Sequence, residues 1–349
     1  MKTVHVSASR GYDVHIGPGL LDTLGNAAKS LLKGRRICVV SDDTVADLYL
    51  KRAENALESA GFSVVSYVFP HGEASKCGEN FLKLMNVLAE NRLTRADGLV
   101  ALGGGVTGDL TGFAASCYLR GVGYIQVPTT LLAMVDSSVG GKTAIDLPAG
   151  KNLCGAFWQP VLVLCDTDLL ATLPEPIFTD GCAEVIKYAV LGDPALFETL
   201  KTGIRDKLET VVATCVEAKR DVVEEDEFDT GRRQLLNLGH TLGHAVEANS
   251  GFQISHGQAV AIGMAMIARA AVKHDLCTEE TRDEMISLLR QCGLPTETDQ
   301  SSEAILATAL GDKKRQGGTL TLIVPTEIGR CILHKIPVTD LPRWISAGL

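Results

Sequence analysis

The chain has 349 residues, of which 46% are hydrophobic and 21% are charged, and its formal net charge is −9 at pH 7. The length predicts two domains, and the composition is typical of a globular protein rather than a disordered one. The negative charge argues against a nucleic-acid-binding protein, which would need a basic face to displace counterions. It still permits a local basic pocket for an anionic small molecule.

No targeting or membrane-spanning segment is expected. The N-terminus lacks the apolar core of a signal peptide, and the longest weakly charged run, 259–274, contains Arg269 and is too short to span a bilayer. The ten cysteines are scattered, form no CxxC pair and lie mostly in apolar runs, as reduced, buried thiols do. We therefore expect a cytoplasmic protein that binds neither membranes nor nucleic acids.

The first half of the chain alternates short β-branched runs with helical stretches. Strands are predicted at 36–41, 62–69 and 98–103, and helices at 45–60 and 80–91. This alternation indicates a parallel sheet, and continuous apolar strands are expected where helices cover both of its faces.

The second half is mainly helical. Helices are predicted at 180–191, 194–223, 239–248 and 256–274, followed by a hairpin of strands at 319–324 and 330–336. The character changes between 158 and 178, so we predict two domains, residues 1–168 and residues 169–349. The predicted fold class is α/β, with an N-terminal Rossmann-like parallel-sheet domain and a mainly α-helical C-terminal domain.

A glycine-rich turn follows the strand at 98–103. Gly103–Gly105 and Asp109 stand at the start of an apolar helix, where backbone N–H groups can approach a phosphate at the positive helix end. The spacing is not the usual GxGxxG, and a plain tight turn is the alternative. Asp42, after an earlier strand, suits ribose hydroxyls, and Thr129–Thr130 either offer hydroxyls or cap the next helix. Together these segments predict that the N-terminal domain binds a dinucleotide.

Three histidines and one glutamate form a candidate metal site. His240 and His244 are four residues apart on one face of a predicted helix, and His256 begins the next helix. Two histidines that face each other across an interhelical turn suit zinc or a similar ion. Glu184 is the best third ligand, because burial of its carboxylate in an otherwise apolar helix calls for a nearby cation.

Each of these residues also has a structural alternative. The histidines could be core or capping residues, and Glu184 could pair with Lys187, three residues further along its helix. Glycines beside all three histidines indicate close packing of the backbone, which favours a metal site over the structural alternatives. Two histidines and one glutamate leave coordination positions open for substrate oxygens, as in catalytic metal sites.

Several cations lie near glycines or motif turns rather than on evident solvated helix faces, one of them in a donor-rich loop at 135–143. Gathered in the fold, they would form a pocket for phosphate or carboxylate, although most single lysines are simply solvated. These cations, together with one asparagine, form the predicted anion pocket: Lys142, Lys151, Asn152, Lys219, Arg233, Lys313 and Lys314.

Taken together, these segments resemble the 3-dehydroquinate synthase family of the sugar phosphate cyclases. The resemblance extends from about Ser41 to about Val324 and implies an NAD-binding N-terminal domain with a metal- and substrate-binding C-terminal domain. The matching motifs are Gly103–Asp109, Pro128–Thr130, Asp136–Asn152, Ala183–Tyr188, Leu235–His244, His256–Gly257 and Asp312–Lys314.

The resemblance implies a role for each matching residue. The ligands of zinc or cobalt would be Glu184, His240 and His256. Contacts to NAD would come from Asp42, Glu73, Lys76, Gly104, Gly105, Asp109, Thr129, Thr130, Lys142, Lys151 and Thr172.

The resemblance also implies how a phosphorylated sugar acid would bind. Its phosphate would be held by Lys142, Asn152, Asn237 and one of Lys313 and Lys314, of which we select Lys314. Lys219 and Arg233 would hold its carboxylate, and Asp136 its ring hydroxyls. His244 would assist proton transfer, Lys187 would lie close to the substrate at the metal, and Arg120 would reach across the interface of a homodimer.

The implied reaction converts 3-deoxy-D-arabino-heptulosonate 7-phosphate into 3-dehydroquinate and phosphate, a step of the shikimate pathway of aromatic amino acid biosynthesis. NAD oxidises the C5 alcohol, phosphate is eliminated, the hydride returns, and an intramolecular aldol addition closes the ring. The metal would polarise the hydroxyl, and the cations would orient an anionic substrate. Either His244 or the substrate phosphate could act as the base in the elimination.

Three other functions fit parts of this pattern. Other sugar phosphate cyclases, of the 2-deoxy-scyllo-inosose, 2-epi-valiolone or amino-dehydroquinate type, share the scaffold, and Lys219 and Arg233 disfavour only the first two, since both residues suit a substrate carboxylate. An iron-type alcohol or glycerol dehydrogenase would need fewer phosphate-binding cations. A non-catalytic binding protein descended from the enzyme would have no use for an open metal site.

Overall fold

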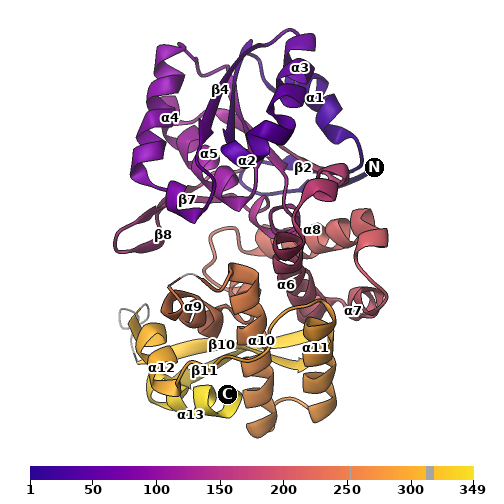
Figure 1. The fold of residues 1–349 in the computed structure, drawn as a ribbon, viewed down its shortest axis with the longest axis vertical. Coiled ribbons are helices and arrows are strands. Elements are labelled where there is room, and N and C mark those ends of the chain that lie inside the picture. The colour runs from indigo at the N-terminus through magenta and orange to yellow at the C-terminus, as the bar shows by residue number, and fades with distance from the viewer. Residues whose placement is uncertain (252, 312–317) are drawn as a thin grey trace. The chain divides into compact units, whose positions relative to one another are not determined.

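The computed structural model describes residues 1–251, 253–311 and 318–349, and the chain divides into two compact units (Figure 1). Unit 1 comprises Met1–Pro174 and Leu208–Phe228, and unit 2 comprises Glu175–Lys207 and Asp229–Leu349. Lys313 and Lys314, two of the predicted substrate-binding residues, lie outside the described residues. No helix within the described ranges is long and apolar enough to cross a membrane.

Unit 1, in which every residue is described, is built on a seven-stranded sheet with the order β1-β2-β9-β6-β5-β3-β4. β1 pairs antiparallel with β2, and the other neighbouring strands are parallel. Every residue of β5 is buried, as expected for a parallel strand covered on both faces. The strands are β1 (Lys2–Val6), β2 (Tyr12–Gly17), β3 (Arg36–Asp42), β4 (Ser63–Phe69), β5 (Gly98–Gly103), β6 (Gly123–Pro128) and β9 (Leu162–Asp166).

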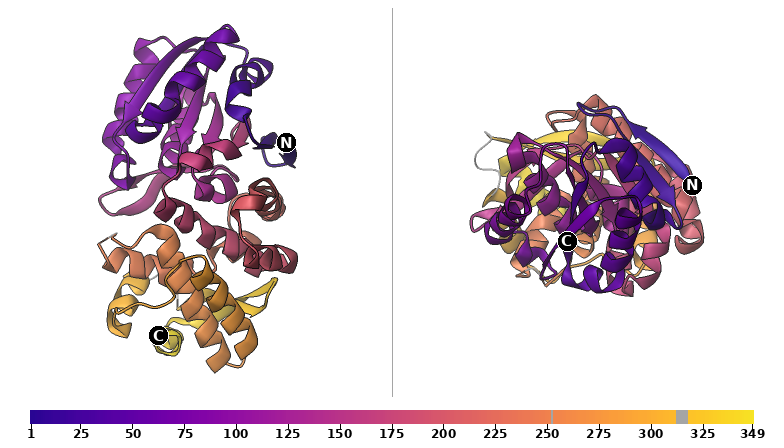
Figure 2. Two further views of the ribbon diagram at one scale, coloured as in Figure 1. Left: turned by 45° about the vertical axis from the view of Figure 1, so that its right-hand side comes forward. Right: turned by 90° about the horizontal axis from the view of Figure 1, so that it is seen from above.

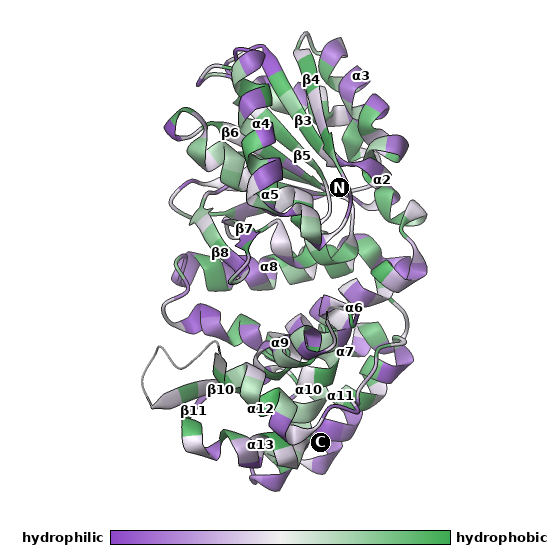
Figure 3. Ribbon diagram, turned by 60° about the vertical axis from the view of Figure 1, so that its left-hand side comes forward, coloured by the Kyte–Doolittle hydropathy of each residue, from purple (hydrophilic) through white to green (hydrophobic). Residues whose placement is uncertain are grey.

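Helices cover both faces of this sheet. Val39 points into an apolar layer with α1 and α3, whereas its neighbours Cys38 and Val40 point into a second layer with α4 and α5, which is the alternation expected along a strand. Figure 3 shows the apolar character of β3 and β5 between these helices. The helices of unit 1 are α1 (Leu24–Leu31), α2 (Asp43–Val45), α3 (Lys51–Ser59), α4 (Gly78–Glu90), α5 (Gly105–Cys117) and α8 (Leu208–Glu225).

A separate antiparallel hairpin, β7 (Lys142–Leu147) and β8 (Gly150–Phe157), packs through β7 against α4 and α5. The sequence predicted a loop at 135–143, but a π-helical turn at Ala133–Ser137 precedes β7, which begins at Lys142. The predicted strands at 36–41, 62–69 and 98–103 are confirmed as β3, β4 and β5. The predicted helix at 45–60 is helical, with a π-helical turn at Ala46–Leu50 between α2 and α3.

Unit 2 is mainly helical, and α10 packs against α6, α9, α11, α13 and β10. Nearly every face of α10 is buried, which is typical of a helix at the centre of a domain. The hairpin β10–β11, yellow in Figure 2, lies beside the orange α10. Within the described ranges, its elements are α6 (Glu175–Gly192), α7 (Pro194–Lys201), α9 (His240–Asn249), α10 (His256–Lys273), α11 (Glu279–Gln291), α12 (Ser302–Gly311), β10 (Thr319–Glu327), β11 (Arg330–Pro337) and α13 (Leu341–Gly348).

The sequence predicted one continuous helix at 194–223, and this prediction is wrong. α7 ends at Lys201, Gly203 has a φ of 111°, and α8 begins at Leu208. A left-handed backbone at Gly203 cannot continue an α-helix, so the chain turns there. α8 then packs against β1 and β2 and belongs to unit 1. The chain therefore passes between the units more than once, whereas the sequence predicted one boundary at 168/169.

The central helices of unit 2 approach one another backbone to backbone. A Cβ atom on Gly263 of α10 would lie 1.9 Å from the carbonyl oxygen of Gly239, just before α9. A Cβ atom on Gly257 would lie 2.0 Å from the carbonyl oxygen of Asp180 in α6. Because no side chain fits at either place, glycine allows α6, α9 and α10 to pack this closely.

This packing predicts the effect of adding one methyl group. Gly263→Ala should destabilise the protein by about 1–3 kcal/mol, because the overpacked helices must move apart. Gly192→Ala is a matched control, since a Cβ atom there meets nothing within 4 Å. Urea unfolding followed by circular dichroism measures the free energy of unfolding of both variants. Equal values for the two would contradict the role of Gly263.

Candidate functional site

The predicted metal ligands come together within unit 2. Glu184 in α6 and the first residues of α9 and α10, His240 and His256, place ligand atoms within 4.8 Å of one another. Oε1 of Glu184 lies 3.4 Å from Nε2 of His240 and 3.4 Å from Nε2 of His256. One carboxylate and two imidazoles that converge in this way are a donor set for a divalent ion such as zinc.

Helix α6 positions two of these ligands. It carries Glu184 itself, and one turn earlier the carboxylate of Asp180 accepts a hydrogen bond from the backbone N–H of Gln258 at 3.0 Å. Asp180 also accepts one from the Ser255 hydroxyl, and Ser255 and Gln258 form a capping box at the start of α10. The N-terminus of α10, and with it His256, is therefore tied to the helix that carries Glu184.

Glu184 is fully buried, and Lys187 has only 1% of its side chain exposed. The two side chains form an ion pair. Burial raises the pKa of Glu184, but the charges of Lys187 and His240 outweigh this effect and hold that pKa well below its usual range. The sequence offered Lys187 and the histidine group as alternative partners of Glu184, and the carboxylate contacts both.

The electrostatics around His256 also favour a cation. Burial lowers the pKa of this imidazole, but Glu184 and Glu247, which face its two ring nitrogens, raise it to about 10. The negative potential that holds a proton on the ring favours any cation at the same place. Donor set and potential therefore both fit a divalent metal ion.

Sequence reasoning missed Glu247. Its buried carboxylate lies on α9, and its Oε2 is 3.6 Å from Nδ1 of His256. Glu247 follows His240 by seven residues and His244 by three, so all three share one face of the helix. That spacing is visible in the sequence and could have identified it.

His244 lies beside the ligands but outside the group formed with Glu184. Its ring centroid is 5.2 Å from that of His240 and 5.8 Å from that of His256. It belongs instead to a second group of close ligand atoms, with Glu247 and His256. Its exposed side chain can exchange protons with solvent.

Two more predicted residues of unit 2 precede α9. Arg233 and Asn237 lie on a 3-10 helix, Arg232–Asn237, that packs against α6. Arg233 is 2% exposed, whereas Asn237 is exposed at the end of this helix. A buried guanidinium and an exposed amide thus lie within a few residues of His240.

In unit 1, the carboxyl ends of three adjacent parallel strands carry much of the predicted dinucleotide site. β3 ends at Asp42, β5 leads to Gly104, the N-cap of α5, and β6 is followed by Thr129–Thr130. Gly105 is the first residue of α5. Oδ1 of Asp42 accepts a hydrogen bond from the backbone N–H of Val45 at 2.9 Å. This edge of a parallel sheet is where such folds bind ligands.

A buried lysine joins further predicted residues of unit 1. Nζ of Lys76 lies 2.9 Å from Oε1 of Glu73, 3.2 Å from Oδ2 of Asp109 and 3.8 Å from Oδ1 of Asp146. Burial raises the pKa of Asp109 to about 6, although the charge of Lys76 opposes this. Lys151 reaches the same group, with its Nζ 3.8 Å from Glu73.

Two other predicted residues lie on the hairpin β7–β8. Asn152, with a φ of 56°, donates its backbone N–H to Oδ1 of Asp146 at 2.8 Å. Lys142 is exposed at the first position of β7. Asp146 was not singled out from the sequence, yet its carboxylate contacts both Asn152 and Lys76.

Asp136 and Lys219 contact each other. Nζ of Lys219, in α8, lies 2.9 Å from Oδ1 of Asp136 and donates to its carbonyl oxygen at 2.6 Å. The sequence predicted both as substrate-binding residues but did not predict this pairing. Arg233, the second predicted partner of a substrate carboxylate, belongs to unit 2.

The remaining predicted residues of unit 1 lie at its surface. Thr172 is exposed, and its Oγ1 lies 2.5 Å from the Tyr49 hydroxyl. Arg120 is exposed on a short turn in which Leu119 and Arg120 have φ angles of 49° and 65°. Two successive non-glycine residues in the left-handed region are strained, and such strain is concentrated at functional positions.

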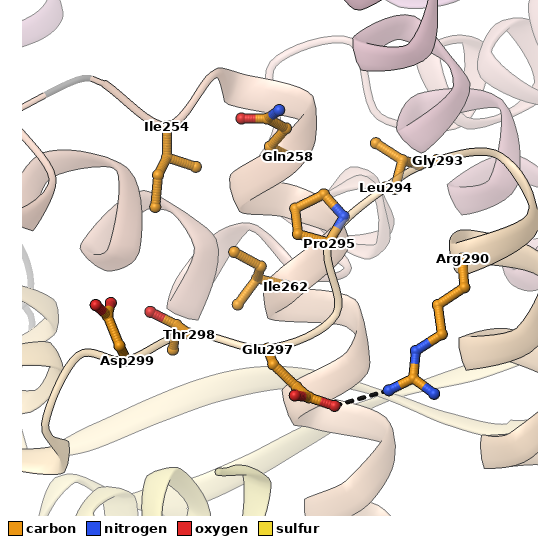
Figure 4. Close-up of a pocket in the computed structure, with 10 residues that line it drawn as sticks. All are labelled: Ile254, Gln258, Ile262, Arg290, Gly293, Leu294, Pro295, Glu297, Thr298 and Asp299. Atoms are coloured by element: carbon orange, nitrogen blue, oxygen red, sulfur yellow. Dashed lines mark hydrogen bonds and ion pairs between the residues drawn. The ribbon is translucent and has the colours of Figure 1, made fainter.

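A cavity of about 920 Å³ opens elsewhere in unit 2 (Figure 4). Ile254, Ile262 and Pro295 supply apolar parts of its lining, and Arg290 forms an ion pair with Glu297 at 2.7 Å. None of the predicted ligands is among its described lining residues. Its described lining contains no histidine, whereas Glu184, His240 and His256 converge on one another, so the histidine and glutamate group is the better candidate site.

The chain is similar to one family along most of its length. Residues 66–180 match the family model for the 3-dehydroquinate synthase N-terminal part, and residues 181–315 match that for the C-terminal part. The chain is 47% identical to the 3-dehydroquinate synthase of Caulobacter vibrioides (strain NA1000 / CB15N), with 96% of this chain and 95% of the relative covered.

Two solved structures share this fold. The complex of 2-deoxy-scyllo-inosose synthase with carbaglucose-6-phosphate, NAD+ and Co2+ has a TM-score of 0.90 at 27% identity and covers 100% of both chains. ValA (2-epi-5-epi-valiolone synthase) from Streptomyces hygroscopicus subsp. jinggangensis 5008, with NAD+ and Zn2+ bound, has a TM-score of 0.88 at 27% identity and covers 97% of this chain and 95% of ValA.

The buried charge cluster of unit 1 yields a prediction. Lys76→Met should raise the pKa of Asp109 above about 6, because loss of the nearby cation disfavours the carboxylate form. A ¹³C NMR pH titration measures this pKa, with Asp109→Asn identifying the resonance. Lys83→Met, at an exposed lysine paired with Glu79, should leave it unchanged. An unchanged or lower pKa in Lys76→Met would be inconsistent with this electrostatic account.

Proposed function

The chain belongs to the 3-dehydroquinate synthase family and is a lyase of the shikimate pathway, and we propose that Glu184, His240 and His256 form the metal centre at which it acts. The reaction converts 3-deoxy-D-arabino-heptulosonate 7-phosphate into 3-dehydroquinate and phosphate. The observation that carries the proposal is the convergence of Glu184 Oε1 with Nε2 of both histidines, at 3.4 Å each.

Identity and site chemistry favour this reaction over those of other cyclases. The chain is 47% identical to a 3-dehydroquinate synthase but 27% identical to the inosose and valiolone synthases of the same fold. Two buried cations, Lys219 and Arg233, suit a substrate that carries a carboxylate. An alcohol dehydrogenase would not need the cations that we assign to the substrate phosphate.

The chain supplies three ligands and leaves the remaining coordination positions to the substrate. When bound, zinc or cobalt polarises a substrate hydroxyl, and NAD accepts and later returns a hydride. The charge of Lys187 helps to hold the pKa of Glu184 well below its usual range, which favours the ionised carboxylate that binds a cation. Lys187 itself would lie close to the substrate and donate to one of its oxygens.

We assign NAD to the carboxyl edge of β3, β5 and β6. The backbone N–H groups at Gly104 and Gly105 would hold the pyrophosphate at the N-terminus of α5, and Asp42 would bind ribose hydroxyls. A Cβ atom at Gly104 would lie 3.1 Å from Thr130, and one at Gly105 would lie 3.2 Å from Ser137, so glycine keeps this turn compact. The remaining contacts would come from Glu73, Lys76, Asp109, Thr129, Thr130, Lys142, Lys151 and Thr172.

Charged and amide groups would hold the substrate. Its phosphate is assigned to Lys142, Asn152, Asn237 and Lys314, whose positive charge and donors lower the cost of phosphate departure. Its carboxylate is assigned to Lys219 and Arg233. Asp136, which we assign to the ring hydroxyls, contacts the ammonium group of Lys219 and holds it in place.

Two features concern proton transfer and assembly. His244, exposed and beside both histidine ligands, is assigned to proton transfer. The strained, exposed turn at Leu119–Arg120 supports our assignment of Arg120 to the site of a second subunit in a homodimer. We also propose that the protein is cytoplasmic, as expected from the sequence.

The activity assay tests the reaction and its metal centre together. With the heptulosonate phosphate, NAD and Zn2+, the protein should release phosphate and form 3-dehydroquinate in equal amounts without a build-up of NADH. His240→Ala should lose bound metal and activity together, because one imidazole ligand is gone. Absence of phosphate release, or steady accumulation of NADH, would refute the reaction. Full metal content in His240→Ala would refute the ligand assignment.

Mixing two inactive variants tests the shared site. If Arg120 serves the partner's site, Arg120→Ala and Lys142→Ala subunits form mixed dimers in which one site has both residues. A random mixture should regain about one quarter of the parent activity, measured as phosphate release after subunit exchange. Each variant alone provides the control. No recovery in a mixture whose exchange is verified would exclude a site built from two chains.

A further inference from the structure

We propose that Glu247 is a positioning residue that holds His256 in the orientation needed to bind the metal. The inference rests on the metal centre of the proposed function and adds a residue to it. It concerns the ring nitrogens of the two histidine ligands that do not face Glu184.

Both histidine ligands are arranged alike. Each presents Nε2 to Oε1 of Glu184 at 3.4 Å, and the other nitrogen of each ring lies near an oxygen. Nδ1 of His240 is 3.1 Å from the backbone carbonyl oxygen of Leu238. Nδ1 of His256 is 3.6 Å from Oε2 of Glu247. Each ring is thus placed between Glu184 and an oxygen on its far side.

Metal binding makes this second contact important. An imidazole that binds a cation through Nε2 must carry its proton on Nδ1, which then acts as a hydrogen-bond donor. A buried donor without an acceptor is costly, and an acceptor on Nδ1 fixes both the tautomer and the ring orientation. For His240 the acceptor is a peptide carbonyl. For His256 it is a carboxylate, which also makes the ring a stronger ligand.

The packing of α9 on α10 holds Glu247 at this place. A Cβ atom on Gly243, between His240 and Glu247 in α9, would lie 2.6 Å from the carbonyl oxygen of Ala259 in α10. This close approach brings the buried carboxylate of Glu247 to the ring at the start of α10. Desolvation of that carboxylate is costly unless it faces a cation or donor, and the Nδ1–H of a metal-bound His256 is such a donor.

One alternative is that Glu247 is itself a ligand. Its carboxylate, His244 and His256 also bring their ligand atoms within 4.8 Å of one another. A metal ion in that group would use Nδ1 of His256 and would not need Glu184. Variants at Glu184 and Glu247 therefore separate the two arrangements.

The experiment measures metal affinity rather than turnover. Metal-free protein is titrated with Zn2+ against a chromophoric chelator, and with Co2+ while its visible absorption is recorded. Glu247→Ala should weaken Zn2+ binding by about 10- to 100-fold and shift the Co2+ spectrum. Glu247→Gln retains an oxygen acceptor without the charge and should lose less affinity. Glu280→Gln, at an exposed glutamate of α11, should match the parent.

The possible outcomes separate this inference from the proposed function. Parent-like affinity and spectrum in both Glu247 variants would overturn the positioning role. Loss of all binding in Glu247→Ala, with binding kept in Glu184→Gln, would make Glu247 a ligand and overturn it as well. Unchanged affinity in both Glu184→Gln and His240→Ala would instead overturn the metal centre. If Glu247→Ala does not fold, as judged by the melting temperature of the metal-free protein, Glu247→Gln decides.

Discussion

The buried carboxylate of Glu184 is the constraint on which the centre of unit 2 depends. A carboxylate with no exposed surface on an otherwise apolar helix is tolerable only where positive charge or donors surround it. Lys187 supplies one charge from the same helix, and His240 and His256 come from two other helices. These helices must approach closely to reach it, which is why glycine occupies their contact points. The same negative charge makes the place attractive to a divalent cation.

Unit 1 contains a second buried charge group with the opposite arrangement. Lys76 is the buried cation there, and the carboxylates of Glu73, Asp109 and Asp146 lie around it. His240 and His256 begin α9 and α10, whereas Glu184 lies in the middle of α6 and Asp109 lies within α5. The same fold serves proteins named as inosose, valiolone and dehydroquinate synthases, so the side chains that it carries, rather than the scaffold, determine the substrate.

The predictions from sequence succeeded where the pattern was local. The strands that became β3, β4 and β5 have continuous apolar runs, and α9 and α10 have helical periodicity with clear ends. The break at Gly203 was missed because the periodicity continues on both sides of it, and only the left-handed backbone shows the turn. Glu247 was missed although its spacing from His240 places both on one helical face, because a lone glutamate gives no reason to expect burial. The contact between Asp136 and Lys219 could not be read from sequence, since 83 residues separate them.

By itself the sequence determined the α/β class, the glycine turn, the family resemblance and the kinds of residue available for a metal and a phosphate. Those properties depend on neighbouring residues and on local spacing, which a chain carries in its order. Only the tertiary structure decided that Glu184 contacts Lys187 and both histidines at once, that Asp180 ties His256 to the helix of Glu184, and that Glu247 faces the other side of the His256 ring. These contacts join separate helices, and their geometry follows from how closely glycine allows the backbones to pack.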